Sequence, residues 1–428
     1  MINKYFENLI HSVFGHAQKG IVRMVDPDGE TRIYGDQLTQ STNTPLPCEP
    51  EAMVKIHRRD CFRKWALAGD IGLAESYLEQ DYECADIEPW IRWLIVNQPY
   101  FMQKNAILRL AIQLKTRMEW FPHAWRHNSK KGSRRNILAH YDLGNAFYSQ
   151  FLDSTMAYSC GLFESPECTL EDAQQAKYRR LAEQLDLSSH HHTLEIGCGW
   201  GGFAIYLAKK YGCRVTGITL SPAQLEYARG WAMREGLQAE VNFELQDYRD
   251  LNGVYDRIVS IEMLEAVGHR YLSHFFETCH RLLANDGRLV VQSITCPDAR
   301  YEQYRKQSDF IRKHVFPGGH LPSCGAILDA TSRKTDLELL RLDCFNEDYA
   351  RTLRLWRARF QANWKSIAPL GFDERFYRLW NFYLAYCEAA FRIRHINLVQ
   401  FTMEHLHQTA NRNVDTHAHA LQTNETFN

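Results

Sequence analysis

The sequence lacks an uninterrupted apolar run of the roughly 20 residues that a membrane-spanning helix needs. Its N-terminal segment, MINKYFENLIHSVFG, has polar residues between its apolar positions and no small-residue cleavage site, so it predicts an amphipathic helix and not a signal peptide. The 12 cysteines include no CxxC pair, and Cys213, Cys279 and Cys387 lie in apolar runs. Reduced thiols in the cytoplasm are therefore expected, without a disulfide framework or a zinc site.

The chain also lacks an excess of either charge, with 50 Lys and Arg against 51 Asp and Glu. No overall field attracts it to nucleic acid, which is not expected as a partner, and any patch that faces lipid must be local. Such a patch is present at residues 101–135, where nine Lys or Arg accompany one acidic residue, Glu119, among many apolar side chains. This stretch favours contact with anionic lipid. A solvated helix followed by a basic linker is the alternative.

The length and the 45% hydrophobic content predict two or three domains with a substantial core. Residues 20–60 contain a hairpin pattern, GIVRMVDPDGETRIYG, and a helical pattern follows from Phe62 to Leu114. We therefore expect four parts, which are an N-terminal domain (1–125), a basic linker (126–138), a second, larger domain (139–408) and a polar tail (409–428).

The larger domain alternates strand-like and helix-like segments, which predicts an α/β fold with a doubly wound, mostly parallel sheet. The expected strands are Thr193–Ile196, Val215–Ile218, Val241–Leu245, Arg257–Ile261 and Arg288–Ile294. Residues 326–408 show long helical patterns rich in Trp, Tyr and Arg.

A glycine-rich turn, LEIGCGWGG at 194–202, lies between the first of these strands and a helix-like segment. Gly197, Gly199 and Gly201 let the backbone pass close to a ligand, and a nucleoside is the ligand that this arrangement usually holds. Thr219 and Gln224 follow the next strand, where a ribose is bound, and Asp247 follows the third, where it suits an adenine amino group. Glu195 is expected to orient the turn. Because no second phosphate-binding feature is present, S-adenosylmethionine fits better than NAD.

With these residues assembled, the chain resembles the cyclopropane-fatty-acyl-phospholipid synthase family of S-adenosylmethionine-dependent methyltransferases, which includes the mycolic acid cyclopropane synthases. The matching segments run in family order over residues 136–400, and they are AHYDLGNAFY, MAYSCGLF, LEIGCGWGG, VTGITLSPAQ, LQDYRDL, YDRIVSIEMLEAVG, FIRKHVFPGGHLPS and DYARTL. The resemblance implies a Rossmann-like class I methyltransferase domain with a smaller α+β N-terminal domain that engages lipid and pairs two chains as a homodimer.

The resemblance also implies the reaction, in which a methyl group passes from the sulfonium to a cis double bond of a phospholipid acyl chain. A proton is then lost to a bound bicarbonate, and a cyclopropane ring closes. The bicarbonate would be held by Glu265, Tyr349 and the backbone near Cys160 and Ile294. Tyr158, Ser159, Leu220 and Gln246 join the glycine turn as residues that contact S-adenosylmethionine.

One position departs from the family pattern, because Gln292 stands where many members have a His. Glutamine donates a hydrogen bond but carries no charge and shuttles no proton. The deprotonation step is therefore the one in doubt, and a methyl-branched or methylene product is an alternative to the ring. A small-molecule N-methyltransferase and a weakly active lipid-binding paralogue are two further alternatives.

The remaining expectations concern the location of the protein in the cell and two kinds of site, a nucleophilic cysteine and a metal site, that the sequence does not favour. We expect a cytoplasmic protein that lies peripherally at the inner membrane face, where its unsaturated phospholipid substrate resides. Cys160 has no neighbouring His in the sequence, so a covalent role for its thiol is not favoured. His190, His191 and His192 precede a strand in an expected surface loop, and no metal site is predicted there.

Overall fold

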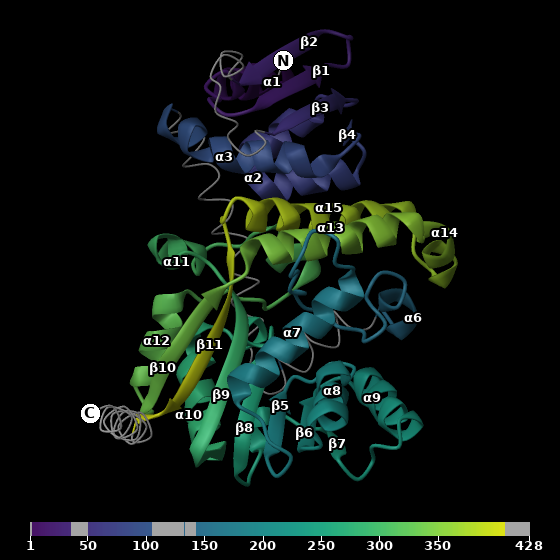
Figure 1. Ribbon diagram of the computed structural model, residues 1–428. Helices are drawn as coiled ribbons and strands as arrows, with labels where there is room; N and C mark the ends of the chain where they lie inside the picture. Colours follow the sequence, from purple (N-terminus) through teal and green to yellow (C-terminus); the bar gives the residue numbers. More distant parts are fainter. Residues whose placement is uncertain (1, 36–49, 105–131, 133–142, 407–428) are drawn as a thin grey trace, which may run out of the picture.

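The computed structural model describes residues 2–35, 50–104, 132 and 143–406. Its N-terminal part packs three helices on a four-stranded sheet of order β2-β1-β3-β4 (Figure 1). These elements are α1 (Ile2–Phe14), β1 (Ile21–Val25), β2 (Thr31–Gly35), β3 (Glu51–Ile56), α2 (Asp60–Leu78), β4 (Tyr82–Cys84) and α3 (Ile87–Lys104). The smaller α+β part that was expected at the N-terminus is present.

The predicted hairpin is confirmed, since β1 and β2 pair antiparallel with Val25 opposite Thr31. Gly29 closes its turn at φ +85°, a conformation that favours glycine. The helical pattern predicted over 62–114 was wrong in one respect, because the short strand β4 divides it into α2 and α3. Most of the basic stretch at 101–135, and the whole tail after residue 406, lie outside the described residues.

The larger part contains a seven-stranded sheet of order β10-β11-β9-β8-β5-β6-β7. Five strands are parallel, as predicted, and they are β5 (His192–Ile196), β6 (Arg214–Thr219), β7 (Val241–Leu245), β8 (Tyr255–Ile261) and β9 (Leu283–Thr295). The other two strands are antiparallel: β11 (Asn397–His405) pairs with β9, and β10 (Leu337–Cys344) pairs with β11 at the edge of the sheet. The fold is therefore Rossmann-like, with helices on both faces of the sheet.

Two apolar clusters bury the two faces of this sheet. One face is covered by α7 (Leu170–Leu185), α8 (Gly202–Tyr211) and α9 (Pro222–Arg234), and the other by α10 (Leu272–Leu282) and α12 (Cys324–Ser332). Short elements complete this part, and they are α6 (Asn145–Tyr148), η2 (Tyr248–Asp250), η3 (Leu264–Ala266), η4 (His269–Tyr271), α11 (Asp298–Tyr304) and η5 (Ile311–Val315).

The helical prediction for residues 326–408 was wrong at two places, because β10 and β11 are strands. β11, NLVQFTMEH, is buried on both faces, so it lacks the alternation that marks a strand in sequence. β10, LELLRLDC, is an edge strand whose central residues are exposed. Pairing of β11 with β9 and of β10 with β11, and not a local preference, determines the two strands.

Long helices lie between the two parts of the molecule (Figure 1). They are α13 (Asn346–Ala362) and α15 (Glu374–Arg392), joined through α14 (Trp364–Ile367) and η6 (Ala368–Leu370). Their aromatic side chains share one apolar core with α1, α2 and α3. Ion pairs add to this contact, since Arg357 on α13 bridges Asp86, which precedes α3, and Glu388 on α15. Within the described residues, no helix is both long and apolar enough to cross a membrane.

Candidate active site

The glycine-rich turn follows β5, at the carboxyl end of the parallel strands. The backbone amides of Gly197 and Cys198 both donate to the carbonyl of Ile218 at the end of β6, with distances of 3.0 and 2.9 Å. Gly199 has φ +54°, and a Cβ atom placed there would meet nothing within 4 Å. The turn is thus held against the sheet on one side and open toward a cavity on the other, as a nucleoside site requires.

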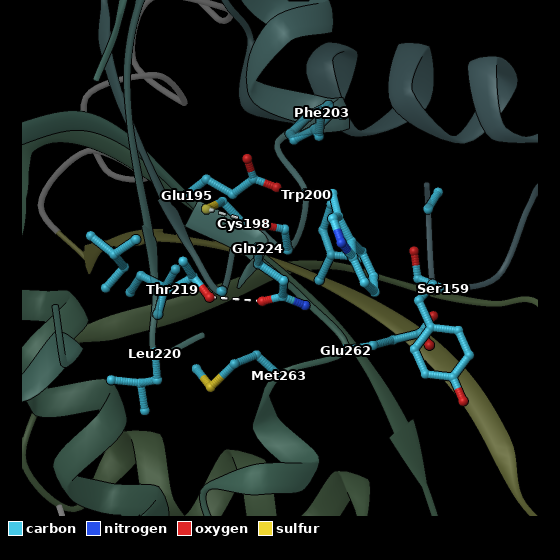
Figure 2. Close-up of a pocket in the computed structure, with 18 of the residues that line it drawn as sticks. Ser159, Glu195, Cys198, Trp200, Phe203, Thr219, Leu220, Gln224, Glu262 and Met263 are labelled. Carbon is cyan, nitrogen blue, oxygen red and sulfur yellow. Dashed lines mark hydrogen bonds between the residues drawn. The ribbon is translucent and has the colours of Figure 1, made fainter. Parts of the chain in front are cut away.

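This cavity, the donor pocket, is lined by ten of the predicted cofactor residues. They are Tyr158, Ser159, Glu195, Gly197, Gly199, Thr219, Leu220, Gln224, Gln246 and Asp247. Figure 2 labels five of them, Ser159, Glu195, Thr219, Leu220 and Gln224. Gly201 does not line the pocket. It has φ +89°, and its Cβ position lies 2.6 Å from the ring of Phe243, so this glycine is needed for close packing beneath the turn.

The polar residues of the donor pocket are held by one another. Thr219 Oγ1 donates to Gln224 Oε1 over 2.7 Å, which fixes the amide beside the turn (Figure 2). Both carboxylate oxygens of Asp247 accept from Arg249, at 2.7 and 2.6 Å. Sequence reasoning missed Arg249, although it follows Asp247 by two positions. Burial raises the pKa of Glu195 to about 8, so this carboxyl is largely protonated at neutral pH.

The segment from Thr155 to Ser159 forms another wall of the pocket, and Cys160, which follows it, does not line the pocket. Lys177 on α7 donates to Ser159 Oγ over 2.7 Å, and burial lowers the pKa of this lysine. Nothing in the sequence distinguished Lys177 from an ordinary helix-surface lysine. The buried Cys160 thiol has a pKa well above its usual range, chiefly because of burial, so it is not an activated nucleophile. Its contribution to the site is its backbone amide.

A second and larger cavity, the acceptor cavity, has a volume of about 750 Å³ and lies between the N-terminal part and the α/β part. Its apolar wall comes from α1, α2, α3, α13 and α15, and includes Val13, Phe14, Trp65, Leu73, Ile91, Ile95, Leu353 and Phe391. Glu265, Ile294 and Tyr349, three of the predicted catalytic residues, also line it. Tyr158, Glu262 and Ala266 line both cavities, so the two meet at these side chains.

Three of the predicted catalytic residues, Tyr349, Gln292 and Cys160, donate hydrogen bonds to Glu262, which sequence reasoning missed. The Tyr349 hydroxyl donates to Glu262 Oε2, and Gln292 Nε2 donates to Oε1 over 2.7 Å. The Cys160 backbone amide donates to the same Oε1 over 3.0 Å. The bicarbonate that the resemblance implies would need these donors. Because the Glu262 carboxylate engages them, the folded chain does not fit a second anion here.

Glu265 lies nearby but has different partners. Its Oε1 accepts from the Ile294 backbone amide and from Ser293 Oγ, the latter at 3.2 Å. Its Oε2 is buried without a hydrogen-bond partner among the described residues. Burial, with the nearby Glu262 carboxylate, raises the pKa of Glu265 to about 8. The structure therefore places Tyr349 on Glu262, and not on an anion shared with Glu265.

Two groups outside both cavities bring carboxylate and imidazole atoms within 4.8 Å of one another, and they are Glu7–His11–Asp26 and His280–Asp336–His405. The sequence did not single out either group. Neither contributes to the lining of the donor pocket or of the acceptor cavity.

Comparison with known protein families shows to which family the chain belongs. Residues 128–401 match the model of the mycolic acid cyclopropane synthetase family. The chain belongs to this family. As members of it are, the chain is an S-adenosylmethionine-dependent methyltransferase, which confirms the predicted family and fold class.

Family members with curated functions cover most of the chain. The tuberculostearic acid methyltransferase of Mycobacterium tuberculosis is 37% identical over 379 residues, which are 87% of this chain and 86% of that protein. The cyclopropane-fatty-acyl-phospholipid synthase of Escherichia coli is 34% identical over 383 residues, which are 87% and 93% of the two chains.

A solved structure of the family agrees with S-adenosylmethionine as the methyl donor. It is a mycolic acid cyclopropane synthase complexed with SAH and CTAB, with 34% identity and a TM-score of 0.59, and it covers 63% of this chain and 97% of that one. In this chain the glycine turn, the Thr219–Gln224 pair and Asp247 line the donor pocket, and these residues fit S-adenosylmethionine. When bound, it supplies an electrophilic methyl group.

Proposed function

We propose that this methyltransferase transfers the methyl group of S-adenosylmethionine to a cis double bond of an unsaturated phospholipid acyl chain and closes a cyclopropane ring. The observation that carries the proposal is the meeting of two cavities of different chemistry at Tyr158, Glu262 and Ala266. A pocket built on the glycine turn, with polar groups of Thr219, Gln224 and Asp247 in its lining, suits the donor, and a larger, mostly apolar cavity suits a hydrocarbon acceptor.

The acceptor cavity supports a long apolar substrate. Its volume of about 750 Å³ falls within the range of about 300–1,000 Å³ that is typical of ligand sites. A soluble amine would not need an apolar wall that three N-terminal helices and two long C-terminal helices build together. The names of the two curated relatives, a fatty-acyl-phospholipid synthase and a tuberculostearic acid methyltransferase, agree with an acyl substrate.

The chemistry at the junction also favours methyl transfer to carbon. An alkene is a weak nucleophile, and its methylated product is a carbocation that water would trap, so the site must exclude water. Tyr158, Tyr349, Tyr383 and Phe391 all line the acceptor cavity. Their ring faces attract a developing positive charge.

A methyl-branched or methylene acyl product is the second candidate. It is favoured by the 37% identity with a tuberculostearic acid methyltransferase and by Gln292, which cannot relay a proton. Both candidate reactions begin with transfer of the methyl group to the double bond. They differ in the product that the resulting carbocation forms.

Because the substrate lies in a bilayer, we propose that the protein acts peripherally at the cytoplasmic face of the inner membrane. Co-sedimentation of the full chain with vesicles of anionic, unsaturated phospholipid tests this location. Binding that is strong at low salt and weak at high salt is the expected result.

Incubation of the purified full chain with vesicles of unsaturated phospholipid and methyl-labelled S-adenosylmethionine tests the function. The proposal predicts label in cyclopropane rings, and vesicles of saturated phospholipid are the matched control. Label in a branched or methylene chain would favour the second candidate, and label only in added amines would indicate an N-methyltransferase. Binding of S-adenosylmethionine without any transfer to lipid would leave a weakly active paralogue.

A further inference from the structure

Glu262 follows β8 directly and lines the donor pocket (Figure 2). It also lines the acceptor cavity, so it lies at the junction of the two. Three donors hold its carboxylate, and they are the Tyr349 hydroxyl, the Gln292 amide and the Cys160 backbone amide. They come from α13, β9 and the segment before α7, which are far apart in the sequence. The tertiary fold therefore builds a cage for one carboxylate at the place where the methyl group must cross.

Two of these donors, the Tyr349 hydroxyl and the Cys160 backbone amide, are groups that the family resemblance assigns to bicarbonate, and Gln292 is the residue that stands where many family members have a His. A side-chain carboxylate and bicarbonate present the same pair of oxygens on one carbon, and both accept a proton. We propose that Glu262 is the proton acceptor of the reaction, in place of a bound bicarbonate. This inference rests on the proposed function, because it assigns the base for the carbocation that methyl transfer creates.

The backbone at Glu262 supports a functional position. Its φ of +51° lies in the left-handed region, which is unfavourable for a residue other than glycine. Its amide donates to the Gln292 carbonyl over 2.8 Å, which anchors this conformation to β9. Strain of this kind is retained where the surrounding structure requires it, and it commonly lies at active sites.

The orientation of Gln292 agrees with this role. Its Oε1 accepts from Gln400 Nε2 on β11 over 2.8 Å, so its Nε2 is directed to Glu262. Gln400 Oε1 accepts in turn from Gln184 Nε2 over 3.0 Å. This row of amides directs a neutral N–H donor, Gln292 Nε2, to the Glu262 carboxylate. An amide does not compete with the carboxylate for the proton. The departure from His at position 292 is then consistent with a base supplied by the chain itself.

The surroundings make Glu262 a stronger base than an exposed carboxylate. Burial raises its pKa, and this effect exceeds the opposite effects of its hydrogen bonds and of the nearby Lys177. A general base works best when its pKa approaches the working pH.

The proton balance is complete without another reactant. The sulfonium–methyl bond breaks with its electron pair left on sulfur, and the π electrons of the alkene form the new carbon–carbon bond. The transferred methyl group then loses a proton to a Glu262 carboxylate oxygen. The freed C–H electron pair forms the third bond of the ring and neutralises the cation.

Bicarbonate dependence and two substitutions test the inference, with labelled methyl incorporation into unsaturated vesicles as the readout. The wild-type rate is expected to be the same in carbonate-depleted buffer and with added bicarbonate. Glu262→Gln keeps the size of the side chain but removes the base, and it should lower the rate at least about 100-fold. Glu226→Gln, at an exposed position on α9, is the matched control and should leave the rate unchanged.

Glu262→Gly provides a second, independent test, because glycine tolerates the positive φ and leaves room for a small anion beside the same donors. Added bicarbonate should restore part of its rate with a saturable dependence, and it should not rescue Glu262→Gln. Binding of S-adenosylmethionine to each variant checks that the donor pocket is intact.

The outcomes separate the two proposals. A wild-type chain that labels lipid only when bicarbonate is supplied would overturn the role of Glu262 and leave the proposed function standing. A near wild-type rate for Glu262→Gln would likewise overturn the role of Glu262 and leave the proposed function standing. A wild-type chain that binds S-adenosylmethionine but labels no lipid under either condition would overturn the proposed function, and the assignment of Glu262 with it.

Discussion

The phenol oxygens of Tyr158 and Tyr383 lie 2.9 Å apart, although 225 positions separate the two residues in the sequence. Tyr158 belongs to the segment that walls the donor pocket, and Tyr383 belongs to α15, which also contacts the N-terminal part. Both rings line the acceptor cavity. This hydrogen bond thus connects the donor side of the site to the helix that shapes the acceptor side.

Replacement of Tyr383 by Phe removes this hydrogen bond and keeps the ring. One buried hydrogen bond contributes about 1 kcal/mol, so we expect a loss of stability of that order and a KM for lipid raised about 5-fold. The affinity for S-adenosylmethionine should change little. Tyr377→Phe on the same helix is the control, since it lies outside both cavities. Equal effects of both substitutions on KM would contradict the role given to Tyr383.

Gly199 and Gly212 offer a matched pair for testing the donor pocket. Both have a positive φ, of +54° and +65°, so alanine imposes a similar backbone strain of about 1–2 kcal/mol at each position. Only at Gly199 does the added methyl group project into the pocket; at Gly212 it meets Ser189 at 3.8 Å. Gly199→Ala should weaken binding of S-adenosylmethionine at least about 10-fold, and Gly212→Ala should not. Calorimetric titration measures both, and a similar loss in the two variants would place the donor elsewhere.

The sequence predicted the parts of the site that depend on local pattern. The five parallel strands alternate with helical patterns along the chain, and the glycine turn follows the first of them, so the donor pocket could be located in advance. β10 and β11 could not be predicted, because β11 is determined by its pairing with β9 and β10 by its pairing with β11. The same holds for Glu262 and Lys177, since a charged residue at a strand end or on a helix is indistinguishable in sequence from a solvated one. Their functional environment exists only after Cys160, Gln292 and Tyr349 are brought together by the fold.

The ion pairs of Arg357 connect the N-terminal part to the long helices. Arg357 is largely buried, donates to Asp86 over 2.7 Å and to Glu388 over 3.1 Å, and Glu388 is 1% exposed. Arg357→Met would leave Glu388 with Arg392 as its remaining cation. We expect a loss of about 2–4 kcal/mol in the free energy of unfolding. Arg333→Met removes an exposed pair with Asp329 and should cost less than about 0.5 kcal/mol. Denaturant unfolding of both variants measures the two losses in the free energy of unfolding.

The raised pKa of Glu265 predicts how stability depends on pH. In the unfolded chain this carboxyl has its ordinary pKa of 4.5, and in the folded chain burial raises the pKa to about 8. The folded state therefore holds the proton more tightly. Below pH 4.5 both states are protonated and the stabilisation is fully present; it is lost as the pH rises from 4.5 to 8, because the unfolded state ionises first.

Glu265→Gln should remove this dependence, since glutamine stays neutral and its Oε1 still accepts from Ser293 and from the Ile294 amide. One proton corresponds to a slope of about 1.4 kcal/mol per pH unit, so the free energy of unfolding of the wild type should fall between pH 5 and 8 more steeply than that of the variant, by about 1 kcal/mol per unit. Denaturant titrations at pH 5, 6.5 and 8 measure both slopes, with the exposed Glu226→Gln as control. Parallel slopes for wild type and Glu265→Gln would show that Glu265 is ionised in the folded chain, as a carboxylate with an ordinary pKa would be.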